Sequence, residues 1–203
     1  MRITGMDDAQ TKAVRMAVII VAIANLAYFV IEFFMAQKIG SVSLFADSAD
    51  FFEDASVNFL IALALGWSAR LRARTGMVLA LVLLFPAAAF LWTAWSKFQT
   101  FTPPAPWLLS ATGLGALVVN LGCAYLLAKF RHHKGSLTKA AFLSARNDAV
   151  ANIAIMGAGV MTLVWPSAWP DLIVGLGIAW MNLDAAREIW QAAQNEHKGG
   201  AEP

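Results

Sequence analysis

The chain has little charge and almost no cysteine. Charged residues make up 14% of its 203 residues, whereas a typical soluble domain has about 25%. Cys123 is the single cysteine, so no disulfide can form within the chain, and its apolar surroundings predict a packing role. The net charge of +2 gives no sign of a nucleic-acid partner. With 59% hydrophobic residues, the composition is that of a membrane protein.

The sequence also lacks the usual signatures of secretion and of catalysis. Asp7 and Asp8 precede the first apolar run, and that run is too long for the core of a cleavable signal peptide. No HExxH, Walker or nucleophile-elbow pattern is present. We therefore do not expect an enzyme.

Six apolar segments are long enough to cross a bilayer, which takes about 20 mostly apolar residues. They are Ala13–Ala36, Val42–Ser68, Met77–Trp95, Trp107–Phe130, Leu137–Val164 and Leu172–Trp190. The connections are too short for a soluble domain. The sequence predicts an all-α membrane protein with six transmembrane helices in residues 13–192. Residues 1–12 would form a cytoplasmic N-terminal segment and residues 193–203 a short cytoplasmic tail, with no C-terminal domain.

The distribution of basic residues predicts the orientation. One set of helix ends carries nearly all of them: Arg2, Lys12, Arg15, Arg70, Arg72, Arg74, Lys129, Arg131, Lys134, Lys139, Arg187 and Lys198. The opposite ends carry only Lys38 and Lys97. Both termini are therefore expected in the cytoplasm. Tryptophans lie at the opposite boundary, as in an interfacial aromatic belt: Trp95, Trp107, Trp165 and Trp169.

The second predicted span contains four acidic residues, Asp47, Asp50, Glu53 and Asp54. Each central Asp costs about 2.5–3.5 kcal/mol on insertion scales, so acids inside a span point to function. Asp47, Asp50 and Asp54 are spaced i, i+3, i+7 and share one helix face. Glu53 is turned about 100° from Asp54 and points elsewhere.

The fifth predicted span supplies a second polar face. Ser144 and Asp148 are spaced i, i+4 and lie one above the other. At about 1.5 Å per residue, Asp50 to Asp54 lie roughly 12–18 Å from the outer start of their helix. Asp148 lies roughly 15 Å from the inner start of its own, and both levels are near the middle of a core about 30 Å thick. Two antiparallel helices would bring three carboxylates and a hydroxyl together.

Carboxylates that converge in a low dielectric repel one another unless positive charge lies between them. A divalent cation supplies this charge, and so does protonation. The alternative is that the acids pair with Arg146 or form hydrogen bonds between helices. One Arg neutralises one acid and not four, so the residues favour a metal site near the midplane.

Three further features leave alternatives open. Glu32, near the outer end of the first span, either lines an exit or lies among the headgroups. His132 and His133 are either plain loop residues or collect metal. Asn120 is expected to form an interhelical hydrogen bond.

The run from Gly40 to Asp54, GSVSLFADSADFFED, resembles the second-helix signature of the cation diffusion facilitators. The resemblance implies exchange of Zn²⁺ or related ions for protons, usually by a homodimer. It also implies a site that joins a [His/Asp]-x-x-x-Asp motif on the second helix to one on the fifth. The first motif corresponds to Asp50 and Asp54, and Asp148 corresponds to the last position of the second.

The resemblance covers the whole six-helix unit, from about Ala13 to Trp190, and includes Trp169-Pro170-Asp171 at the start of the sixth span. Most members carry a cytoplasmic metal-binding domain after the sixth helix, and this chain is expected to lack one. Dimerisation would then rest on the membrane helices.

Ser144 departs from the family pattern, because it stands where His or Asp is usual. Asn147, one residue off that face, is an alternative oxygen ligand. A site made only of oxygen atoms favours harder ions such as Mn²⁺, whereas the family implies Zn²⁺ or Cd²⁺. The predicted ligand set is therefore Asp50, Asp54 and Asp148, with Ser144, Asp47 and Asn147 as further candidates.

The predicted function is efflux of a divalent cation by proton antiport, with Zn²⁺ or Cd²⁺ first and Mn²⁺, Fe²⁺ or Co²⁺ as alternatives. No cofactor is expected beside the transported ion. The expected location is a bacterial cytoplasmic membrane. The rival hypothesis from another class is an accessory subunit that binds metal without transporting it.

Overall fold

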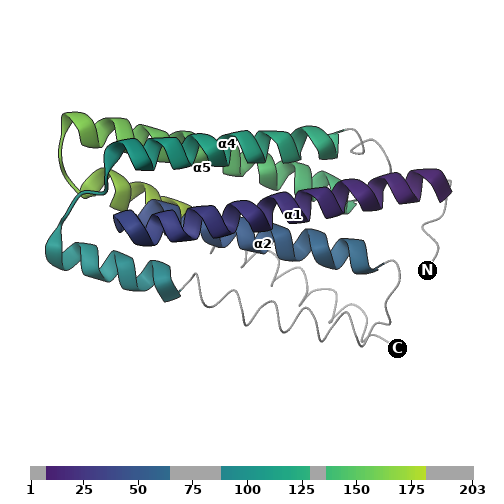
Figure 1. Ribbon diagram of the computed structural model, residues 1–203, viewed down its shortest axis with the longest axis horizontal. Helices are drawn as coiled ribbons and strands as arrows, with labels where there is room; N and C mark the ends of the chain where they lie inside the picture. The colour runs from purple at the N-terminus through teal and green to yellow at the C-terminus, as the bar shows by residue number, and fades with distance from the viewer. Residues whose placement is uncertain (1–7, 65–87, 129–135, 182–203) are drawn as a thin grey trace, which may run out of the picture.

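The computed structural model describes residues 8–64, 88–128 and 136–181, and the side chains of residues 12–59, 62, 88–128 and 148–181. Every regular element in those ranges is a helix, which confirms the all-α prediction (Figure 1). The helices are α1 (Asp8–Ile39), α2 (Val42–Ala64), residues 88–100, α4 (Pro106–Ala128), α5 (Ser136–Val164) and Trp169–Met181. The predicted tail, residues 193–203, and the loop histidines lie outside the described residues.

The long helices lie side by side along the long axis of the molecule (Figure 1). α1 packs against α2 and α4, α4 packs against α5, and α2 reaches α5 across the bundle. α1 and α2 form a tight antiparallel hairpin, since α2 begins three residues after α1 ends. Gly40 makes this turn possible, because its φ of +61° is a conformation that residues with a Cβ rarely adopt. We call this extremity of the bundle the Gly40 end.

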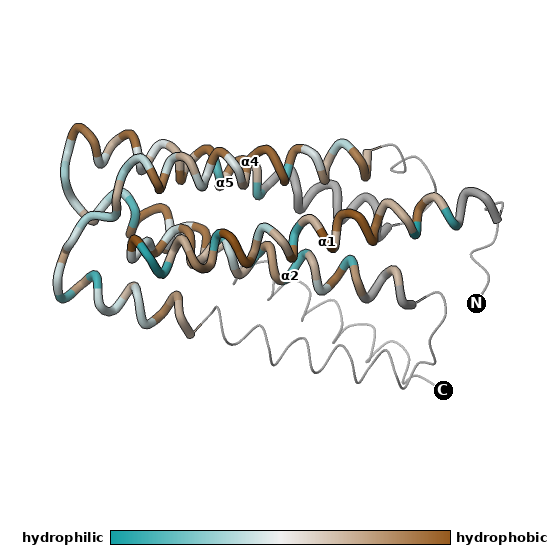
Figure 2. The backbone as a smooth tube through the Cα atoms, in the orientation of Figure 1, coloured by the Kyte–Doolittle hydropathy of each residue, from teal (hydrophilic) through white to brown (hydrophobic). Residues whose placement is uncertain are grey.

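Two described helices, Lys12–Ile39 and Pro106–Ala128, are long and apolar enough on their own to cross a membrane. Hydrophobic residues cover most of the length of both (Figure 2). Asp148–Val164 and Trp169–Met181 are shorter apolar helices. α2 is long enough to cross a membrane but is not apolar enough by the same measure, because its four acidic residues interrupt the apolar sequence.

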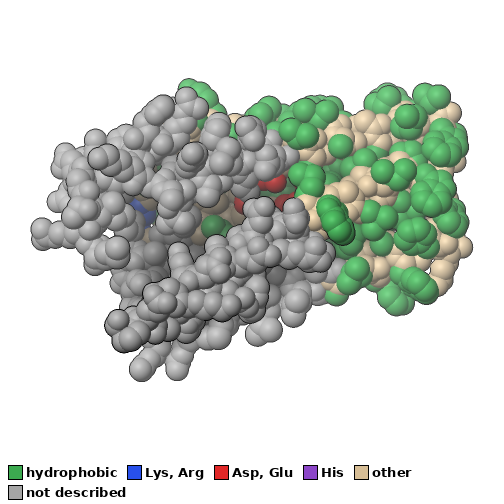
Figure 3. All heavy atoms as spheres, turned by 180° about the vertical axis from the view of Figure 1, so that it is seen from behind, with side chains coloured by type: hydrophobic (Ala, Val, Ile, Leu, Met, Phe, Trp, Pro, Cys, Tyr) green, Lys and Arg blue, Asp and Glu red, His purple; other side chains and the backbone are tan. Residues whose placement is uncertain are grey.

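The bundle is apolar outside, and several polar and charged side chains are buried inside it. Large side chains such as Trp92, Val118 and Val164 are at least 63% exposed, and apolar side chains cover the described surface in Figure 3. Glu32 and Asp171, in contrast, have no exposed surface. A soluble protein would not expose such an extended apolar surface, whereas a lipid-facing one must.

The predicted aromatic belt comprises four of the six described tryptophans, and Trp92 and Trp180 are exposed as well. Trp95, Trp107, Trp165 and Trp169 are all exposed, and each lies near a connection at the Gly40 end (Figure 1). The ring of Trp169 also contacts that of Phe101, at a centroid distance of 5.7 Å. The helix of residues 88–100 continues beyond Trp95, the predicted end of its span, to Thr100.

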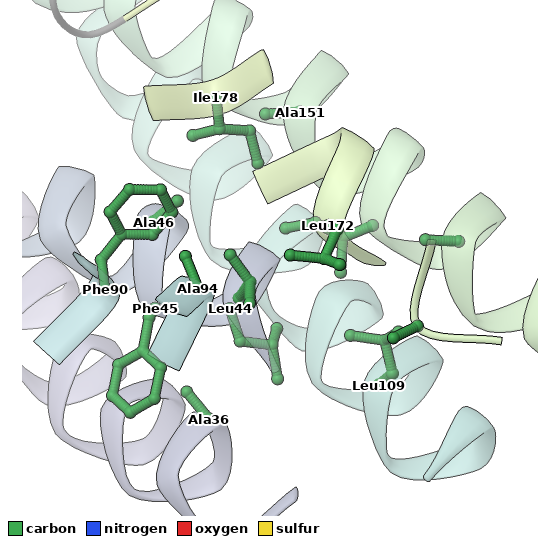
Figure 4. Packing of buried hydrophobic residues seen from close by; sticks show 14 residues of the cluster. Ala36, Leu44, Phe45, Ala46, Phe90, Ala94, Leu109, Ala151, Leu172 and Ile178 are labelled. Atoms are coloured by element: carbon green, nitrogen blue, oxygen red, sulfur yellow. The ribbon is translucent and has the colours of Figure 1, made fainter. Parts of the chain in front are cut away.

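Two apolar clusters hold the helices together. The larger one joins α1, α2, α4, α5, residues 88–100 and the last described helix, and includes Leu44, Phe45, Leu109 and Leu172 (Figure 4). The smaller one joins α1, α2 and α4 and includes Cys123, which is buried as predicted. Between these clusters the interior is polar, and the acidic residues lie there.

Candidate cation-binding site

The start of α2 is fixed by a carboxylate from another helix. Asp171 lies at the beginning of Trp169–Met181 and is fully buried. It accepts hydrogen bonds from the backbone N–H groups of Val42 and Ser43, at 2.8 and 3.1 Å. It also accepts hydrogen bonds from the hydroxyls of Ser41 and Ser43, at 2.7 and 2.6 Å. A carboxylate is favourable here because the first N–H groups of a helix have no partners within the helix.

Ser41 completes this cap as the residue before α2. Its Oγ accepts a hydrogen bond from the N–H of Leu44 at 3.2 Å, which is the usual N-cap pattern. Lys97 lies beside the same turn. Its side chain is 5% exposed, donates a hydrogen bond to the Thr102 carbonyl, and is attracted electrostatically by Asp171. The cap sets the register of α2, and with it the positions of the acids further along.

Asp47, one turn into α2, takes part in a chain of hydrogen bonds across three helices. The amide of Asn152 on α5 donates to Asp47 Oδ2 at 2.6 Å. The amide of Asn120 on α4 donates to Asn152 Oδ1 at 2.9 Å. The interhelical hydrogen bond predicted for Asn120 is therefore confirmed. All three side chains are at most 3% exposed, so the chain lies inside the bundle.

Asp50, Asp54 and Asp148 lie together where α2 meets α5. Asp148 interacts most strongly with Asp54, both through charge and through a side-chain hydrogen bond. Of the charged groups, Asp148 acts most strongly on Asp50. All three side chains are partly buried. Acidic side chains also appear as one patch about midway along the molecule (Figure 3).

The other predicted ligands are placed differently. Ser144 and Asn147 belong to α5, with Ser144 one turn before Asp148, but their side chains lie outside the described residues. Asp47 is on the same helix as Asp50, but one of its oxygens is bonded to Asn152. Among the described side chains, no group of three or more His, Cys, Asp or Glu residues forms a ready metal cage.

The structure adds two residues to the sequence-based site. Glu32 on α1 is fully buried and interacts with Asp47. Asn152 is one turn after Asp148 on α5 and orients Asp47. The i, i+4 spacing of Asp148 and Asn152 would have indicated a shared face, although a lone Asn within an apolar run is a weak signal.

This arrangement concentrates negative charge in the interior. Five carboxyl groups, from Glu32, Asp47, Asp50, Asp54 and Asp148, act electrostatically on one another, and the exposed Glu53 also acts on Asp50 and Asp148. Carboxylates in such surroundings need protons or a cation to offset their repulsion. A metal ion and protons therefore compete for the same carboxylates.

Comparison with known proteins is consistent with this chemistry. Residues 18–193 match the family model of the cation efflux transmembrane domain. The match begins within α1 and extends past the last described helix. No curated protein matches the chain.

Proposed function

This chain belongs to the cation efflux family, the cation diffusion facilitators, and from that premise we propose that it exports a divalent metal ion in exchange for protons through Asp50, Asp54 and Asp148. Membership of the family makes it an integral membrane protein and a transporter of metal cations, not an enzyme. Beyond family membership, the proposal names the transported ion, the exchange of that ion for protons, and the residues that bind it.

The contact between Asp54 and Asp148 across α2 and α5 is the observation that carries the proposal. Two carboxylates from different helices remain together only when a proton or a cation lies between them. A divalent ion neutralises both, and Asp50 is near enough to act on the same point. When the two helices move relative to each other, this ligand set opens, and the ion is released.

The proposed ion is Zn²⁺ or Cd²⁺, as the resemblance to the family implies. Carboxylate oxygens alone favour harder ions such as Mn²⁺, so Mn²⁺, Fe²⁺ and Co²⁺ are the alternative substrates to test. Ser144 and Asn147, close to Asp148 along α5, are proposed to add oxygen ligands. Asp47 accepts a hydrogen bond from Asn152 and is proposed as a further candidate ligand.

Proton coupling follows from the same carboxylates. The described side chains include no histidine, so within that part of the chain the returning protons are carried by acids. Each proton taken up removes a negative charge from the ligand set and weakens metal binding. We also propose a homodimer formed through membrane helices in a bacterial cytoplasmic membrane, because the exposed apolar faces of the helices allow it.

The test is metal flux into proteoliposomes driven by an imposed pH gradient. Wild-type protein should accumulate Zn²⁺ when the gradient favours exchange, and Asp54→Asn and Asp148→Asn should reduce the rate to that of empty vesicles. Glu53→Gln is the matched control, because it removes an exposed acid next to Asp54 and should retain transport. Binding of Zn²⁺ without flux would favour the accessory-subunit hypothesis instead.

A further inference from the structure

We propose that the cavity between α1, the start of α2 and the helix of residues 88–100 binds an anionic phospholipid, whose headgroup phosphate is held by Lys97. The inference does not depend on which ion the protein transports. It rests on four observations: the cavity itself, a buried ammonium group on its wall, a change from polar to apolar lining along its length, and an opening toward the lipid-facing surface.

The cavity lies at the Gly40 end and has a volume of about 590 Å³. Cavities that bind small ligands in proteins typically measure about 300–1,000 Å³. Phe33 and Gln37 of α1 line one side, Phe45 of α2 lines the bottom of the hairpin, and Trp92 and Lys97 line the side of the helix 88–100. The cavity is therefore large enough for a headgroup and the first part of an acyl chain.

Lys97 places a cation on the wall of this cavity. Its side chain is only 5% exposed. An ammonium group has three N–H donors, and that of Lys97 donates one hydrogen bond to the Thr102 carbonyl. Among the described residues, Asp171 is the one charged group that acts on Lys97 electrostatically. The oxygens of Asp171 already accept four hydrogen bonds from Ser41, Val42 and Ser43, so donors of Lys97 are left for a ligand.

The charge around Lys97 favours an anion. The negative charge of Asp171 is offset by the start of α2, where the N–H groups and the helix dipole are positive. A buried ammonium group is unfavourable unless an acceptor of opposite charge lies close to it. Phosphate oxygens are such acceptors, and basic pockets between membrane helices commonly hold lipid phosphates.

The position of Lys97 is fixed by the turn between α1 and α2. A Cβ at Gly40 would lie 3.5 Å from Cε of Lys97 and 3.6 Å from its Nζ. The side chain therefore lies against this turn while its ammonium group is held by the Thr102 carbonyl. Because the lysine is already ordered, a ligand loses less binding energy to the ordering of its partner.

The lining of the cavity changes from polar to apolar with distance from the Gly40 end. Gln37 is two residues before the end of α1, or about 3 Å, whereas Phe33 is six residues before it, or about 9 Å. On the other side, Ala89 precedes Thr100 by eleven residues, or about 16 Å. A phospholipid in this leaflet has the same order, with its headgroup outside and its chains inside.

The cavity also opens toward the apolar surface of the bundle. Trp92 lines the cavity and is 73% exposed, and it belongs to the surface that faces lipid. Thr100 and Thr102, at the other end of the lining, are exposed at the Gly40 end. A free anion needs only the polar opening, whereas a lipid needs both. The two openings therefore favour a lipid over a free anion.

The experiment measures lipid binding to the purified full-length protein in detergent by native mass spectrometry. Wild-type protein should bind one dioleoylphosphatidylglycerol per chain, about tenfold more tightly than the zwitterionic dioleoylphosphatidylcholine. Lys97→Met keeps the length of the side chain without its charge. It should bind phosphatidylglycerol about tenfold more weakly, because a hydrogen bond to a charged group is lost.

Lys38→Met is the matched control, because Lys38 is also near the Gly40 end but is exposed and does not line the cavity. It should bind phosphatidylglycerol as wild type does. Equal affinities for the two lipids in wild type, or equal affinities of Lys97→Met and Lys38→Met for phosphatidylglycerol, would overturn the proposal.

A second pair of variants tests the apolar part of the cavity in case Lys97→Met does not fold. Ala89→Phe fills space between α1 and the helix 88–100, because Ala89 lines the cavity. It should weaken binding of phosphatidylglycerol about tenfold. Ala88→Phe is its control, since Ala88 is exposed and does not line the cavity. The same affinity in both variants would show that no acyl chain enters the cavity, which would overturn the proposal.

Phosphate compounds without acyl chains separate a lipid from a free anion. Inorganic phosphate and glycerol 3-phosphate carry the same oxygen acceptors as the headgroup. At millimolar concentration, neither should displace phosphatidylglycerol from wild-type protein. Displacement by either compound would mean that the cavity binds a free phosphate through Lys97, and the assignment of a phospholipid would be wrong.

Discussion

The carboxylate of Asp171 accepts a hydrogen bond of 2.8 Å from the backbone N–H of Val42, so one helix caps the first turn of another. The two residues are 129 positions apart in the chain. The beginning of α2 is therefore held by the beginning of Trp169–Met181, and the acids of α2 keep a fixed depth relative to the Gly40 end.

We predict that Asp171→Ala lowers stability by at least about 3 kcal/mol, because it leaves buried N–H and hydroxyl donors without an acceptor. Asp171→Asn should lose less, since its amide oxygen still accepts. Thermal unfolding in detergent, followed by circular dichroism, should give the highest unfolding midpoint for wild type, a lower one for Asp171→Asn and the lowest for Asp171→Ala. Equal midpoints for wild type and Asp171→Ala would show that the cap contributes nothing.

Gly175 allows the same pair of helices to approach closely. A Cβ at Gly175 would come within 2.8 Å of the backbone of Val42 and Ser43, which cannot move aside easily. We predict that Gly175→Ala lowers the unfolding midpoint although Ala favours a helix by about 1 kcal/mol over Gly.

Gly177→Ala is the matched control for this prediction. It lies in the same helix, and no described atom comes within 4 Å of the point that a Cβ at Gly177 would occupy. It should therefore leave the midpoint unchanged or raise it slightly. A midpoint for Gly175→Ala as high as that of Gly177→Ala would contradict the close approach.

The hydrogen bond between Asn120 and Asn152 should give a measurable coupling energy. We predict about 0.6 kcal/mol, and at most about 1.7 kcal/mol, from a double-mutant cycle with Ala at both positions, as found for side-chain hydrogen bonds between membrane helices. Asn152→Ala alone should cost more than Asn120→Ala, because it also removes the partner of Asp47. Additive effects of the two substitutions would mean that the bond does not persist in the membrane.

Ser144→His should shift metal preference. Ser144 lies one turn before Asp148 on α5, and an imidazole at that position is a ligand suited to Zn²⁺. We predict a higher ratio of Zn²⁺ to Mn²⁺ affinity, measured by calorimetry on the purified variant. An unchanged ratio would show that position 144 does not face the ion.

Much of the fold could be predicted from the sequence, because a helix that crosses a bilayer needs about 20 mostly apolar residues. Apolar runs of sufficient length predict the order of the helices, and the spacing of Asp50 and Asp54 predicts a shared helix face; in the structure both acids interact electrostatically with Asp148. The helix ends were less well predicted, since helices continue beyond the apolar core, as in residues 96–100.

The long-range polar contacts could not be predicted in the same way. Nothing in the local sequence shows that Asp171 caps α2 or that Asn152 orients Asp47, because both contacts depend on how distant helices pack. Periodicity identifies the face on which a residue lies but not the residue opposite it. For the same reason the sequence does not show that Glu32 on α1 lies beside Asp47 on α2.

The most direct test records metal and proton movement together in one preparation. Proteoliposomes loaded with a Zn²⁺ indicator and a pH indicator would receive external Zn²⁺ without an imposed pH gradient. We predict that Zn²⁺ entry drives protons out, and that Asp148→Asn stops both signals together. Zn²⁺ entry without proton movement, or an Asp148→Asn variant that transports at the wild-type rate, would contradict exchange of metal for protons at these carboxylates.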